Sequence, residues 1–230
     1  MPGEMQCAFE QLLGCAGTVS HKTLKFPKAD DVAASELKPE IERVYRSLGG
    51  ILPAIHLNLR HWDIEFDKIA VELDECLHFN CYRTITLNSE TYKRLPGFPL
   101  KDYHRFCSKR AAECLRAGSW GKRWSNKGSE AQFGEAAEPK DLSGNGSPRW
   151  KQRAFYDFVK DLSPLLIQVP VVRVAVYDTV LDAGRTKTVE DILAALIRQS
   201  APTASREASS AALAALVKER AADLTGQRRI

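Results

Sequence analysis

The sequence contains no long hydrophobic run, and this absence argues against a membrane-spanning helix. None of its apolar stretches approaches the roughly 18 consecutive residues that a membrane-spanning helix requires. Residues 1–16 include Glu4 and Glu10 but no basic leader, which argues against a secretory signal. We therefore expect a cytoplasmic protein without a membrane partner.

Several short catalytic motifs are also missing. The sequence has no glycine-rich phosphate loop, no serine-centred nucleophile elbow and no HExxH zinc motif. No internal repeat stands out either. The chemistry of this chain therefore has to be sought in less familiar arrangements of side chains.

Cysteines are few and scattered, and paired CxxC spacing is absent. A chain of 230 residues does not depend on disulfides, so the six cysteines are expected as free thiols in a reducing compartment. A zinc site could be drawn from Cys76, His78, Cys81, Cys107 and Cys114. Without the paired spacing, and with Cys107 and Cys114 seven residues apart on an expected helix, a structural zinc ion is disfavoured.

The overall composition is that of a globular protein. Hydrophobic residues make up 44% and charged residues 27% of the chain, enough for one good-sized domain or two small ones. The net charge of +4 permits a nucleic-acid partner without arguing for one.

Residues 61–75 alternate apolar and acidic side chains across an expected turn at Asp67-Lys68. This alternation predicts a β-hairpin with one apolar face and one acidic face. The apolar face would carry Trp62, Ile64, Phe66, Ile69, Val71 and Leu73, and the acidic face Asp63, Glu65, Glu72 and Asp74. A turn at Asp67-Lys68 places Phe66 opposite Ile69, Ile64 opposite Val71, and Asp63 opposite Glu72.

The opposition of two carboxylates needs an explanation. Like charges directly opposite on a sheet are destabilising, but a divalent cation reverses the sign of the interaction. Mg²⁺ prefers oxygen ligands and usually takes one or two carboxylates together with water and substrate phosphate. The alternative is a solvated acidic face whose charge is balanced by Lys68 and nearby arginines.

The remaining pattern predicts an α/β fold. Helices are expected at 4–13, 35–48, 103–117, 149–162, 189–198 and 207–224, and a buried strand at 169–176. Residues 51–59 suit a strand or a buried connector, 84–87 a short strand extension, and 118–147 a loop. We expect an N-terminal extension at 1–34, one domain at 35–198 with an insertion at 88–148, and a linker with an Ala-rich helix at 199–230.

The pattern Asp63…Glu72-Leu73-Asp74-Glu75…His78 resembles the core of the restriction-endonuclease-like fold, the PD-(D/E)xK nuclease superfamily. It is most similar to the very-short-patch-repair endonucleases and related uncharacterised bacterial proteins. The later order of helix, strand and helix agrees with that family. The resemblance covers roughly 36–87 and 149–198. It implies a mixed sheet containing the hairpin, flanked by helices.

This resemblance also implies an activity, namely hydrolysis of phosphodiester bonds in DNA assisted by Mg²⁺ or Mn²⁺. Asp63, Glu72 and Asp74 would be the metal ligands and, with His78, the catalytic residues. The chain departs from the family at position 74, where Asp74 replaces the usual lysine, and at Glu75, where glycine is usual. The role of the missing lysine is therefore unassigned.

A basic segment with aromatic residues follows the hairpin. Cations grip phosphates and aromatic rings stack on bases, so this segment is a candidate nucleic-acid-binding surface. The alternative is a solvated helix and loop whose tryptophans dock on the core. The candidate residues are Lys109, Arg110, Trp120, Lys122, Arg123, Trp124 and Lys127.

Two functions therefore remain open. One is a metal-dependent nuclease acting on DNA. The other keeps the nuclease fold but lacks the reaction, and acts as a nucleic-acid-binding or assembly module. The Ala-rich helix at 207–224 is a candidate contact for a second copy of the chain or for a partner protein.

Overall fold

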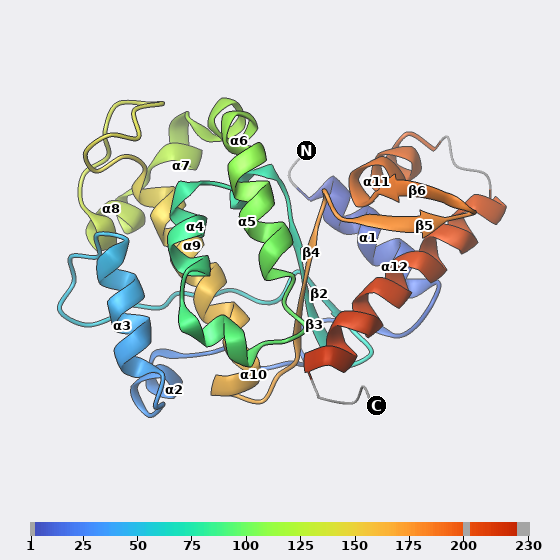
Figure 1. Ribbon diagram of the computed structural model, residues 1–230, viewed down its shortest axis with the longest axis horizontal. Coiled ribbons are helices and arrows are strands. Elements are labelled where there is room, and N and C mark those ends of the chain that lie inside the picture. The colour runs from blue at the N-terminus through green and yellow to red at the C-terminus, as the bar shows by residue number, and fades with distance from the viewer. Residues whose placement is uncertain (1–2, 200–202, 225–230) are drawn as a thin grey trace.

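A four-stranded mixed sheet lies between two layers of helices (Figure 1). The computed structural model describes residues 3–199 and 203–224. The strand order is β1-β2-β3-β4, with β1–β2 and β2–β3 antiparallel and β3–β4 parallel. The strands are β1 (Val19–Ser20), β2 (Ile64–Phe66), β3 (Ile69–Asp74) and β4 (Val171–Ala175). The expected mixed α/β architecture is confirmed.

The predicted hairpin and its register are confirmed. Ile64 pairs with Val71, and Phe66 pairs with Ile69. Asp67 and Lys68 have φ values of 47° and 66°, as the two central residues of a type I′ hairpin turn require. The sequence at these two positions therefore sets the register, because a two-residue turn leaves the flanking strands no freedom to slip.

The expectation that Trp62 shares a face with Ile64 is wrong. Trp62 packs with Ala70 and Val171, whereas Ile64 belongs to the main core together with Val71. Since β2 begins only at Ile64, the strict alternation of a strand does not extend back to Trp62.

The face of the sheet that carries Val71 and Leu73 is covered by helices from both ends of the chain. In Figure 1 they form the layer on the right, beside a small second sheet. These elements are α1 (Glu4–Gly14), α11 (Val189–Ile197), α12 (Thr203–Leu224), β5 (Thr179–Asp182) and β6 (Arg185–Thr188). The three predicted helices are confirmed; the β5–β6 hairpin was not predicted. Residues 200–202 of the expected linker and 225–230 lie outside the described residues.

The opposite face is covered by α9 (Pro148–Asp161), which packs on β4 and lies at the centre of the left-hand layer of Figure 1. The start of α9 is encoded locally, by a Ser147 side chain that accepts the Trp150 N–H and by Pro148 in the first turn. The other helices of this layer are α2 (Ala29–Ala33), α3 (Lys38–Ser47), η1 (Cys76–His78), α4 (Cys81–Leu87), η2 (Glu90–Arg94), α5 (Leu100–Lys109), α6 (Ala111–Gly118), α7 (Gly121–Trp124), α8 (Lys127–Phe133) and α10 (Ser163–Leu166).

Three local predictions are wrong. Residues 84–87 belong to α4 rather than to a strand, because Asn80 caps the helix through its side chain. The helix expected at 103–117 is two helices that meet at Arg110. The loop expected at 118–147 contains α7 and α8, and Asn126 caps α8 in the same way.

The segments expected as extension and insertion contribute directly to these layers. Residues 1–34 supply α1 and the edge strand β1, and residues 88–148 supply much of the helical layer around α9. Among the described residues, no helix combines the length and the apolar character needed to cross a membrane.

Candidate functional site

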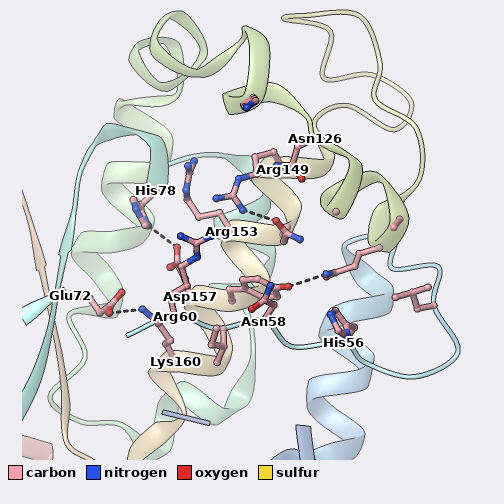
Figure 2. Close-up of a pocket in the computed structure, with 18 of the residues that line it drawn as sticks. His56, Asn58, Arg60, Glu72, His78, Asn126, Arg149, Arg153, Asp157 and Lys160 are labelled. Carbon is pink, nitrogen blue, oxygen red and sulfur yellow. Dashed lines mark hydrogen bonds and ion pairs between the residues drawn. The ribbon is translucent and has the colours of Figure 1, made fainter. Parts of the chain in front are cut away.

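A cleft of about 850 Å³ opens beside α9, bounded by α8 and by the irregular segment 51–62 (Figure 2). Such a volume is typical of ligand sites in proteins. Charged and polar side chains dominate its wall. They include His56, Asn58, Arg60, Asp63, Glu72, His78, Lys122, Asn126, Gln132, Arg149, Gln152, Arg153, Tyr156, Asp157 and Lys160.

Asp63 and Glu72 meet in this cleft, as the hairpin register predicted. The Asp63 N–H donates to Glu72 Oε1 at 3.3 Å, and the Leu73 N–H donates to Asp63 Oδ2 at 3.1 Å. Burial and the negative charge of Glu72 together raise the pKa of Asp63 to about 7. The two carboxylates are thus held side by side, and one of them resists ionisation.

Lys160, on the last turn of α9, compensates the charge of Glu72. Its Nζ lies 2.6 Å from Glu72 Oε1 and 5.2 Å from the centre of the Trp62 ring. Both Lys160 and Glu72 are buried. No hydrogen bond to Oδ1 of Asp63 is found in the part of the chain that the structure describes.

Asp74 lies one layer deeper and does not line the cleft. Its Oδ1 is 2.8 Å from the Arg173 guanidinium, and its Oδ2 accepts the Tyr103 hydroxyl at 2.7 Å. Both carboxylate oxygens are therefore occupied by protein donors. The structure brings Asp63, Glu72 and His78 to the cleft and keeps Asp74 behind them.

Arg173 is the centre of a buried charge network. From β4 it reaches Asp161 at 2.7 Å and Asp157 at 3.2 Å, in addition to Asp74. Although burial alone would lower the pKa of Arg173, these carboxylates raise it well above its usual value. The guanidinium therefore stays charged and ties β3, β4 and α9 together.

A second arginine extends this network away from the cleft. Arg83 on α4 lies 2.7 Å from the other oxygen of Asp161, and the Tyr92 hydroxyl donates to the same atom at 2.6 Å. Each acid of the network is hydrogen-bonded to a cation or a hydroxyl. Buried charges are tolerated in proteins when they are paired and hydrogen-bonded in this way.

His78 connects the buried network to the cleft. Its Nδ1 lies 2.8 Å from Asp157 and 3.2 Å from Asp74, and its side chain is 22% exposed. Burial would lower the pKa of His78, but the charges of Asp157 and Asp74 outweigh this effect and raise it. Within the described residues Nε2 has no partner, so this nitrogen is free to meet a bound molecule.

The group Asp74, His78 and Asp157 could also hold a metal ion. Each residue offers one ligand atom, and these atoms lie within 4.8 Å of one another. A metal there would compete with the proton on His78 and with Arg173, which already contacts both carboxylates. The donor set of one imidazole and two carboxylates suits a transition metal better than Mg²⁺.

Of the predicted basic segment, Lys122 alone lines the cleft. Trp124 is buried against Trp150 with ring centres 5.3 Å apart, which agrees with the alternative of a core-docked tryptophan. Trp120 is 56% exposed and stacks under Arg123 at 4.6 Å. The other members are exposed and are not part of the cleft wall: Lys109, Arg110 (over the Tyr177 ring) and Lys127.

Sequence reasoning missed the residues that α9 and β4 bring to the site. Arg149, Arg153, Asp157 and Lys160 recur every three or four residues, which puts them on one helix face. Arg173 is a lone charge in an apolar strand. Both signals were present in the sequence, and each pointed to a charged partner inside the fold.

Comparison with known proteins gives a family but no activity. A family model described as a family of unknown function (DUF7255) matches residues 43–195, which include every cleft residue discussed above. No curated protein matches the chain, and no solved structure matches it.

Proposed function

The chain belongs to the DUF7255 family, and we propose that it is a metal-dependent nuclease that hydrolyses phosphodiester bonds in DNA. One observation carries the proposal: a single cleft holds the facing carboxylates of Asp63 and Glu72 and a wall of cations. Phosphodiester hydrolysis requires both, since carboxylates bind the metal and cations bind the phosphates.

The resemblance to the PD-(D/E)xK superfamily supports the same proposal. The hairpin β2–β3, helix α9, strand β4 and helix α11 follow one another in the order expected for that core. Asp63 and Glu72 stand at the expected acidic positions and lie together in space. We therefore propose that the chain shares the fold of that superfamily.

The donor set of the Asp63–Glu72 pair fits Mg²⁺ or Mn²⁺. Two carboxylates facing a roomy cleft leave the remaining coordination positions to water and phosphate oxygens, as these ions prefer. Asp63 Oδ1 is the oxygen without a protein donor, so Asp63 and Glu72 would hold the ion. When bound, the metal supplies charge neutralisation at the phosphate and a water of lowered pKa.

Lys160 supplies the positive charge that the superfamily motif places two residues after the glutamate. Here that position is Asp74, and the ammonium comes instead from α9, 2.6 Å from Glu72. Lys160 orients Glu72 and presents a cation to the phosphate.

In this proposal His78 acts as the general acid. Asp157 and Asp74 bind its Nδ1 and keep it protonated, so Nε2 can deliver a proton to the leaving oxygen. Asp157 and Asp74 are thus positioning residues for His78. Hydrolysis adds one water across the P–O bond: its hydroxide goes to phosphorus and its proton replaces the one that His78 gives away.

A cleavage assay tests the proposal. Plasmid, single-stranded DNA and RNA are incubated with the protein and Mn²⁺, Mg²⁺ or EDTA. We expect Mn²⁺- or Mg²⁺-dependent cleavage that Glu72→Gln reduces by at least 100-fold and that Glu138→Gln, on the exposed surface, leaves intact. Cleavage that survives Glu72→Gln, or no cleavage of any substrate, refutes the nuclease.

The alternative is a nucleic-acid-binding module without catalysis. The observation that favours it is the pairing of Glu72 with Lys160 and of Asp74 with Arg173, which neutralises these acids without a metal. This module predicts salt-dependent DNA binding with no heat of Mg²⁺ or Mn²⁺ binding in calorimetry. A nuclease predicts a metal-binding heat that Asp63→Asn removes.

A further inference from the structure

Three arginines line the cleft that also holds Glu72. Arg149 and Arg153 are one turn apart on the same face of α9, and Arg60 approaches from the segment before β2. Figure 2 shows the two α9 arginines above Asp157, with Lys160 further along the helix and Glu72 beside it. Like charges have thus been brought together.

This cluster lacks a carboxylate at ion-pair distance in the described chain, although the charge of Asp157 acts on Arg149 and Arg153 from further away. Among residues 3–199 and 203–224, none of the three arginines forms an ion pair. Arg149 donates to Gln152 Oε1 at 2.6 Å and Arg153 to the Leu77 carbonyl at 3.3 Å, both neutral acceptors. Burial lowers the pKa of Arg149, and the charge of Arg60 adds to this effect, while Tyr156 and Asp157 act against it. Such a cluster is unfavourable until an anion joins it.

A buried amide in the same cleft also lacks a partner. Gln132 is 4% exposed, and its Nε2 donates to the Tyr156 hydroxyl at 2.9 Å. Its Oε1 has no hydrogen bond in the described structure. An orphaned buried acceptor calls for a ligand that donates. A sugar hydroxyl or a base N–H can donate this hydrogen bond, whereas an ionised phosphate has oxygen acceptors and no hydrogen to donate.

We propose that Arg60, Arg149 and Arg153 form a phosphate-binding subsite that holds a nucleic-acid strand at a phosphate remote from the one cleaved. The identity of the ligand as a strand rests on the proposed function. The planar guanidinium forks bind phosphate oxygens in pairs, and Gln132 receives a hydrogen bond from the adjoining sugar or base.

The spacing along α9 suits a strand rather than a single phosphate. Arg149 and Asp157 are eight residues apart, or about 12 Å at 1.5 Å per residue. A single phosphate group cannot span this distance, so the two ends of the helix would contact different nucleotides of one strand. One helix therefore carries the subsite at its first turns and the proposed reaction centre at its last.

Fluorescence anisotropy of a labelled single-stranded 12-mer in EDTA tests the subsite without cleavage. The full chain is compared with the double variant Arg149→Gln/Arg153→Gln. We expect at least tenfold weaker binding and a salt slope smaller by about 0.7 for each phosphate released. The single variant Arg60→Gln, on an exposed segment, is expected to weaken binding without any effect on folding.

The matched control is Arg185→Gln/Arg198→Gln, on the opposite side of the sheet, which makes the same change in net charge. Equal weakening in both double variants, no weakening in the cleft variants, or no binding by the wild type overturns the subsite. Inorganic phosphate is added as a competitor. If it displaces the 12-mer at a concentration below about 1 mM, the arginines bind free phosphate, and the proposal that their ligand is a nucleic-acid strand is overturned.

The outcome is separable from that of the cleavage assay. Glu72→Gln leaves the arginine cluster intact and is expected to bind the 12-mer as the wild type does. Loss of binding in the arginine variants together with failed cleavage by the wild type retains the subsite and rejects the nuclease. Normal binding in the arginine variants together with Glu72-dependent cleavage by the wild type retains the nuclease and rejects the subsite.

Discussion

The buried network around Arg173 and the cleft in front of it use the same residue types in opposite ways. In the network, every acid has a cation or hydroxyl within hydrogen-bonding distance, and Arg173 contacts three aspartates. In the cleft, Asp63 is repelled by Glu72, and Arg149 and Arg153 form no ion pair within the described chain. The network is complete without a ligand, and the cleft is not.

This difference separates charges that hold the fold together from charges that serve a ligand. Removing a paired buried charge leaves its partners unsatisfied, which costs stability. Removing an unpaired charge costs little, because nothing in the chain depends on it. Substitutions in the network should therefore lower the free energy of unfolding strongly, and substitutions of unpaired cleft residues only weakly, although the two sets of residues are close neighbours.

The largest effect is expected for Arg173→Met. Without the guanidinium, Asp74, Asp157 and Asp161 lose a shared cation in a buried position, and the free energy of unfolding should fall by about 3–5 kcal/mol. Urea unfolding followed by circular dichroism measures the loss. Arg185→Met on the exposed β6 is the control, expected within about 0.5 kcal/mol of wild type. A loss below 1.5 kcal/mol, on the order of an ordinary mutation, would contradict a structural network.

An intermediate effect of opposite sign is expected for Asp63→Asn. The folded protein keeps the proton of Asp63 up to a pKa of about 7, whereas the unfolded chain releases it near 3.8. As pH rises between these values the unfolded state binds fewer protons, so Asp63 destabilises the fold increasingly. Asp63→Asn removes this penalty and should raise the free energy of unfolding by about 2 kcal/mol at pH 8.

The gain should shrink as the pH falls towards 3.8 and disappear below that value, where the wild-type carboxyl is protonated in both the folded and the unfolded state. Denaturation in EDTA at pH 4.5 and pH 8 measures the difference, and Glu138→Gln on the surface serves as the reference. A gain that is equal at both pH values would show that the Asp63 charge is not the cause.

The smallest effect on stability is expected for Arg149→Gln. Within the described chain its guanidinium has one hydrogen-bond acceptor, Gln152, and the attraction of Asp157 is opposed by the charges of Arg60 and Arg153, so its loss removes repulsion as well as one hydrogen bond. The free energy of unfolding should stay within about 0.5 kcal/mol of wild type. A loss comparable to that of Arg173→Met in the same urea experiment would erase the distinction between network and cleft.

Much of the hairpin could be predicted because its signals are local. The alternation in 61–75 and the turn at Asp67-Lys68 specify which residues face one another, including Asp63 and Glu72. The face on which Trp62 lies was predicted wrongly, because the strand begins two residues later than the alternation suggests. The helix boundary at Asn80 was missed because a capping side chain outweighed the β-branched residues that follow.

The candidate site could be predicted only in part. Asp63 and Glu72 are nine residues apart, but Lys160 and Arg173 come from elements about 90 to 100 residues further along the chain. The periodicity of helices and strands relates only residues that are close in the sequence, so it could not predict that these residues meet. The role expected for Asp74 as a metal ligand depended on its face of the strand, and the structure shows that Arg173 and Tyr103 occupy its oxygens.

The sequence by itself determined the hairpin, its register, the amphipathic helices and the buried strand, because each depends on neighbours within one or two turns. The tertiary structure decided which charges are neutralised and which are left for a ligand. Electrostatic pairing depends on distance in space and on burial, and both are set only when α9 and β4 pack beside the hairpin.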